Sequence, residues 1–139
     1  MRPALVALIA CTLPLHALAQ EGPMGIAFVQ APEQSWGVAM GATPGEAFQT
    51  ATEMCVTGGA EARDCLQTNW CFPAGWSIDI FAQHQEGLHW HEVQCGLPER
   101  ALAEAVAAQL CDRAARPWLI ECALVQVYDP QGTPMMPYE

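Results

Sequence analysis

The chain has 139 residues, with fifteen acidic and five basic side chains and a formal net charge of −10. All five basic residues are arginines, so the chain lacks the lysine amine that a pyridoxal Schiff base or a phosphate-binding loop requires. The acidic balance also argues against nucleic acid and anionic membranes as partners, because both need clustered positive charge.

The first segment, residues 1–19, has the pattern of a signal peptide. Arg2 supplies a positive start, an almost wholly apolar run follows, and Ala17-Leu18-Ala19 matches the small-x-small cleavage pattern. We therefore expect a mature chain that begins at Gln20 and is exported to the periplasm or outside the cell. An alternative is a lipoprotein anchored at Cys11, because Leu8-Ile9-Ala10-Cys11 resembles a lipobox. No later segment is apolar over the ~20 residues that a membrane span needs.

After a short N-terminal tail at 20–24, residues 25–71 read as one structural unit. Two short strands, 25–29 and 36–40, are predicted to form a hairpin. Thr43-Pro44 then predicts the start of a helix, with Thr43 as N-cap and Pro44 in the first turn, and Gly58-Gly59 predicts its end. A strand over 64–71 completes the unit.

Residues 76–128 repeat that order, with a hairpin of 76–82 and 88–95, a helix over 98–111 and a strand over 118–128. Four matches support a tandem duplication, at offsets of 54 to 57 residues: Trp36 with Trp90, Pro44 with Pro98, Cys55 with Cys111, and Cys65 with Cys122. Chance similarity is the alternative. The prediction is a single α+β domain over 25–128 with an antiparallel sheet and two helices. Residues 129–139 are expected to form a flexible tail.

Six cysteines follow the predicted signal peptide, an even number that in an exported chain of this size predicts three disulfides. Zinc fingers are disfavoured because no CxxC pair is present. Six cysteines allow 15 connectivities. If the duplication holds, the cysteine that ends each helix faces the one that opens the next strand. Symmetry then predicts the pairs Cys55–Cys65 and Cys111–Cys122, with Cys71–Cys95 across the strands.

The order of hairpin, small-residue helix ending in cysteine, acidic-Cys strand and Asn69-Trp70-Cys71 resembles the exported bacterial family known as domain of unknown function 4189. The likeness covers about residues 25–128 and includes a partial second copy. The chain departs from the family pattern at 72–76, where Phe-Pro-Ala-Gly-Trp replaces an alanine-rich strand. The resemblance implies export and a disulfide-stabilised α+β fold, and it brings no known activity or catalytic residue.

The hairpin at 78–94 carries three histidines, His84, His89 and His91. If Glu86-Gly87 forms a two-residue turn, strand alternation places all three imidazoles on one face, where they could ligate zinc or copper with Glu86 as a fourth donor. A one-residue bulge would separate them. The other interpretation is a half-buried sheet whose hydrated tip happens to carry histidines.

Trp70 and Trp76 flank the 73–75 turn and are candidates for a binding patch, with a role in the core as the alternative. Catalysis has no visible nucleophile, because the only serines, Ser35 and Ser77, lie outside a nucleophile elbow and the cysteines are expected to be bridged. We therefore expect a non-catalytic, monomeric binding or accessory module without a cofactor, whose partner is an unidentified protein or small ligand. The alternative is a zinc- or copper-binding protein.

Overall fold

The computed structural model describes residues 22–135. They form two helices and seven strands in two antiparallel sheets, and three disulfides cross-link the chain. This is the predicted α+β class. The predicted signal peptide and the alternative lipid anchor at Cys11 lie outside the described residues. Within residues 22–135, neither helix is long and apolar enough to cross a membrane.

The first unit contains β1 (Gly25–Ala31), β2 (Ser35–Gly41), α1 (Pro44–Thr57) and β3 (Leu66–Cys71), and its strands lie in the order β2-β1-β3. Helix α1 begins as predicted, since the Thr43 hydroxyl accepts a hydrogen bond from the Glu46 backbone N–H at 3.3 Å. The helix packs closely on β2 at Gly37, where an added Cβ would lie 1.8 Å from the Ala51 carbonyl oxygen. Only glycine permits this approach.

The second unit contains β4 (Trp76–His84), β5 (His89–Leu97), α2 (Arg100–Leu110) and β6 (Leu119–Tyr128). Its strands lie in the order β5-β4-β6, the same order as in the first unit, as a duplication requires. A further short strand, β7 (Pro134–Met135), pairs with the end of β6.

The segment that follows β6 differs from the prediction of a flexible tail. The Asp129 carboxylate accepts hydrogen bonds from the backbone N–H groups of Gln131 and Thr133, which closes a turn. The Gln126 amide then donates to the Met135 carbonyl oxygen at 2.7 Å. These side-chain hydrogen bonds, which the proline content of the segment does not reveal, hold residues 129–135 against the sheet.

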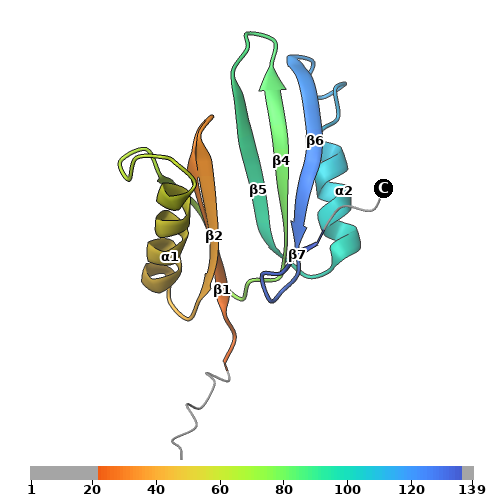
Figure 1. The fold of residues 1–139 in the computed structure, drawn as a ribbon. Helices are drawn as coiled ribbons and strands as arrows, with labels where there is room; N and C mark the ends of the chain where they lie inside the picture. The colour runs from red at the N-terminus through yellow and green to blue at the C-terminus, as the bar shows by residue number, and fades with distance from the viewer. Residues whose placement is uncertain (1–21, 136–139) are drawn as a thin grey trace, which may run out of the picture.

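The elements form four layers in the order α1, first sheet, second sheet, α2 (Figure 1). A separate apolar cluster fills each of the three interfaces. Strand alternation explains this arrangement, because Val29 and Ala31 of β1 face α1 whereas Ile26 and Phe28 face the second sheet. The single sheet of the prediction is thus two sheets packed face to face, each with its own helix outside.

The three disulfides join the pairs that symmetry predicts. Cys55–Cys65 ties the last turns of α1 to the residue before β3, Cys111–Cys122 ties the end of α2 to β6, and Cys71–Cys95 links β3 of one sheet to β5 of the other. The Asn69 side-chain amide adds a second link between the sheets by donating to the Val93 carbonyl oxygen at 3.2 Å. Both links lie toward the end of the molecule opposite the hairpin tips.

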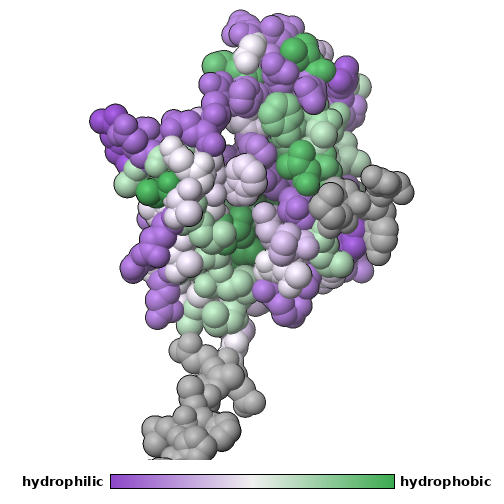
Figure 2. Space-filling model, in the orientation of Figure 1, coloured by the Kyte–Doolittle hydropathy of each residue, from purple (hydrophilic) through white to green (hydrophobic). Residues whose placement is uncertain are grey.

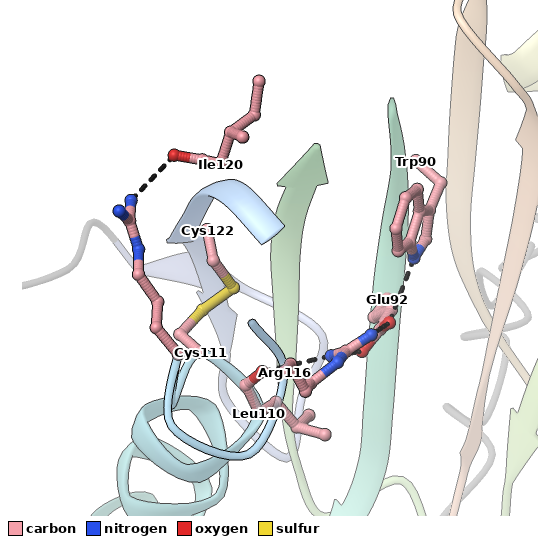
Figure 3. The surroundings of a disulfide bond; sticks show 8 residues. Trp90, Glu92, Leu110, Cys111, Arg116, Ile120 and Cys122 are labelled. Carbon is pink, nitrogen blue, oxygen red and sulfur yellow. Dashed lines mark hydrogen bonds and ion pairs between the residues drawn. A yellow bond between two sulfur atoms is a disulfide. The ribbon is translucent and has the colours of Figure 1, made fainter. Parts of the chain in front are cut away.

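The loop closed by Cys111–Cys122 is held on α2 and β5 by Arg116 (Figure 3). Its guanidinium donates to both carboxylate oxygens of Glu92, and to the Leu110 carbonyl oxygen at 3.1 Å. The Trp90 indole N–H donates to the same carboxylate. The hydrogen bond from Arg116 has the largest effect on the pKa of Glu92 and holds it below its usual range, and the hydrogen bond from Trp90 acts in the same direction. The outer face of β5 is therefore occupied by a closed polar network.

Candidate functional site

The hairpin tips of the two sheets lie at the same end of the molecule, away from Cys71–Cys95 (Figure 1). A cleft lies between them. Its volume is about 200 Å³. One wall is residues 30–36, the turn between β1 and β2, and the other consists of Phe81, His89, Trp90 and His91 from β4 and β5. In the space-filling view, hydrophobic and near-neutral residues occupy the middle of the seam between the two halves, and hydrophilic residues surround its upper end (Figure 2).

Trp36 is the largest side chain at the mouth of this cleft. It lies on β2, where alternation directs Ser35 and Gly37 toward α1 and Trp36 toward the second sheet. Its ring stacks on the His91 imidazole, with centroids 5.8 Å apart and planes at 21°. Trp36 nevertheless keeps 55% of its surface exposed. The indole therefore has one face fixed against the second sheet while much of the ring contacts solvent.

The Asp79 carboxylate holds the His91 imidazole in place. Its Nδ1 lies 2.8 Å from the Asp79 Oδ1, and the Asp79 side chain is only 8% exposed. The hydrogen bond to Asp79 raises the pKa of His91, and the negative charge of Asp79 adds to it against the opposing effect of burial. The pair thus holds the imidazole in a set orientation against Trp36.

Tyr128 lies beside the same carboxylate. Burial, followed by the charge of Asp79, raises the pKa of the Tyr128 hydroxyl to about 12, while a hydrogen bond with Trp36 acts in the opposite direction. Tyr128 also makes an edge-to-face contact with Phe28, with ring centroids 5.6 Å apart. The uncharged Tyr128 side chain therefore lies between the polar groups near the cleft and the apolar cluster between the sheets.

Glu33 lies at the tip of the β1–β2 turn, on the rim of the cleft. Its backbone has a φ of 63°, a left-handed conformation that non-glycine residues adopt at an energetic cost. The turn is closed by a hydrogen bond from the Gln34 N–H to the Ala31 carbonyl oxygen at 3.0 Å. This geometry brings a Glu33 carboxylate oxygen to 3.7 Å from the His89 Nδ1 across the gap between the sheets.

The three predicted histidine ligands do not share a face, which corrects the sequence-based expectation. The two-residue turn at Glu86-Gly87 would pair His84 with His89. The observed register pairs Gln83 with His89 and Phe81 with His91, which is a shift of one residue. His84 consequently points to the face opposite His89 and His91. The shift arises because the turn is longer than two residues, with the His84 N–H bonded to the Leu88 carbonyl oxygen at 2.8 Å. Across residues 22–135, no group of three His, Cys, Asp or Glu side chains is placed to hold a metal ion.

Trp70 and Trp76, the predicted binding patch, lie on different sides of the molecule. Trp70 packs between Phe48 of α1 and Phe72 on the outer face of the first sheet. Trp76 packs against the apolar cluster between the second sheet and α2. The two strands belong to different sheets, so their proximity in sequence does not bring the indoles together.

Sequence reasoning did not place three residues in the cleft, Glu33, Trp36 and Phe81, and it missed Asp79, the partner of His91. One signal was present, because Asp79 is a carboxylate in the otherwise apolar stretch 78–82. A buried charge in such a strand needs a partner. Nothing in the local sequence identifies that partner as His91 or places Trp36 beside it.

In the part of the chain that the structure describes, His91 has its side-chain hydrogen bond with Asp79, and no serine, threonine or cysteine side chain bonds to its ring. All six described cysteines are in disulfides.

Comparison with known proteins found no matching family model, no similar curated protein and no similar solved structure. The resemblance to domain of unknown function 4189 therefore stays a prediction from the residues that carry it.

Proposed function

We propose that this protein is an exported, non-catalytic binding module that holds its ligand in the cleft between its two sheets. Three disulfides support an oxidising compartment such as the periplasm or the cell exterior, in agreement with the predicted signal peptide. The observation that carries the binding role is Trp36, a large aromatic side chain that is stacked in place on His91 and still 55% exposed. Exposed, oriented aromatic rings are typical of recognition sites.

The architecture suits such a role because the cleft is pre-formed. The two sheets are tied together by Cys71–Cys95 at one end, so the hairpin tips at the other end keep a defined spacing. A pre-formed site loses little conformational entropy when a ligand binds. The volume of about 200 Å³ lies below the ~300–1,000 Å³ of sites for drug-sized ligands. It fits one side chain of a partner or a small molecule.

The test is a fragment screen of mixed chemistry, observed by two-dimensional NMR on the isotope-labelled, oxidised mature chain. We expect amide and indole shifts that cluster at Trp36, Phe81 and His91. The Trp36→Leu variant should lose these shifts, whereas Trp118→Leu, which removes an exposed tryptophan that does not line the cleft, should keep them. Binding that clusters elsewhere, or that survives in Trp36→Leu, would refute the proposal.

A further inference from the structure

The charges around the cleft favour a cationic ligand. Glu33 is the carboxylate that lines the cleft, whereas Asp79 is buried and paired with His91. None of the four described arginines lines the cleft, because each interacts elsewhere: Arg63 with Glu61, Arg100 with Glu104, Arg113 with the Ile120 carbonyl oxygen and Arg116 with Glu92. Glu33 is therefore the carboxylate at the rim that has no arginine beside it.

The geometry of the aromatic wall adds a second attraction for a cation. The Trp36 ring is stacked on one side and exposed on the other, so its negative π-face is open toward solvent at the mouth. Indole rings attract cations most strongly among aromatic side chains. Phe81 also lines the cleft, with its ring centroid 5.6 Å from that of His89 and 5.9 Å from that of His91. The cleft thus offers an apolar floor and an electronegative rim.

The exposed face of the Trp36 indole favours a planar cation as the ligand. A guanidinium stacks flat on an indole and donates hydrogen bonds in its plane, which an ammonium ion cannot do. Its ~three-carbon stem is apolar and suits contact with Phe81 in a cleft of about 200 Å³. Glu33 is 53% exposed, so its carboxylate can turn from His89 toward an incoming donor.

We propose that the cleft recognises a guanidinium group, stacked on Trp36 and hydrogen-bonded to Glu33. This inference rests on the proposed binding function and specifies its ligand class. The group is supplied either by the arginine side chain of a partner protein or by a free small guanidine, and both present the same chemistry to the site.

The test compares arginine with citrulline, its uncharged isostere, by titration calorimetry on the oxidised mature chain. Nα-acetyl-arginine amide represents the free ligand, and a short peptide with one central arginine represents a partner protein. We expect both arginine compounds to bind at least about threefold more tightly than their citrulline counterparts. Tighter binding of the peptide identifies a protein as the source, and equal binding identifies a small guanidine.

Two variants and two matched controls locate the interaction. Glu33→Gln and Trp36→Leu should each abolish the preference for arginine. Glu86→Gln, an exposed acid on the β4–β5 turn, and Trp118→Leu should keep it. Circular dichroism and NMR spectra establish that each variant is folded.

Equal affinity for arginine and citrulline would overturn the inference, as would a loss in Glu86→Gln as large as that in Glu33→Gln. If uncharged fragments shift the cleft resonances while arginine does not bind, the guanidinium inference fails and the binding function stands. If no compound shifts the cleft resonances, both fail.

Discussion

Removal of the Cys71–Cys95 disulfide should be the most destabilising of the three possible disulfide deletions. The three closed loops, 55–65, 71–95 and 111–122, do not overlap along the chain. Each disulfide therefore restricts a separate part of the unfolded chain, and the loop-closure entropy can be evaluated for each bond by itself.

The expected magnitudes follow from the loop lengths. A separation of 24 residues for Cys71–Cys95 gives a loss of about 3.4 kcal/mol in the free energy of unfolding at room temperature. Separations of 10 and 11 residues give about 2.7 and about 2.8 kcal/mol for Cys55–Cys65 and Cys111–Cys122.

The assay is urea denaturation of the mature chain, followed by far-ultraviolet circular dichroism. The variant Cys71→Ala/Cys95→Ala is compared with Cys55→Ala/Cys65→Ala, in which alanine likewise replaces both sulfur-bearing side chains. A loss of less than about 1 kcal/mol for the first variant, or a larger loss for the second, would contradict loop entropy as the main contribution.

Two further predictions concern His91 and its neighbours. Asp79 raises the pKa of His91, so the pair stabilises the fold below the ordinary histidine pKa of about 6.5, and this contribution disappears as pH rises through the folded-state pKa. The difference in unfolding free energy between the wild type and His91→Gln should therefore shrink as pH rises above the ordinary histidine pKa, and a constant or growing difference would contradict the assignment. Because His84 lies on the opposite face, zinc and copper(II) should show no sub-micromolar binding by calorimetry. Such binding, lost in His89→Ala/His91→Ala, would instead support the metal-binding alternative.

Local signals in the sequence predicted the elements well. Thr43 and Pro44 indicated the start of α1 because capping involves atoms only three residues apart. The order of the elements followed from hydrophobic periodicity, and the disulfide pairs followed from the similarity of the two units. In each case the interacting groups lie close in the chain or in matching positions of the two units.

The arrangement of the histidines on the 78–94 hairpin could not be predicted from local signals. Turn length sets the register, and a one-residue difference moves a side chain to the opposite face. The turn between His84 and Leu88 is longer than the Glu86-Gly87 turn that the sequence suggested, which separates His84 from the other two histidines. Glycine and an acidic residue are compatible with both turns, so composition could not choose between them.

The amino-acid sequence by itself determined the acidic character, the two helices, the order of the strands and the disulfide framework of this protein. Only the tertiary structure decided that the strands form two stacked sheets, and that Trp36 of the first meets His91 of the second above Asp79. The physical reason is that strand alternation specifies which residues share a face, whereas the face that packs against another sheet depends on contacts between segments far apart in the chain, such as Trp36 and His91. The cleft exists only through that packing.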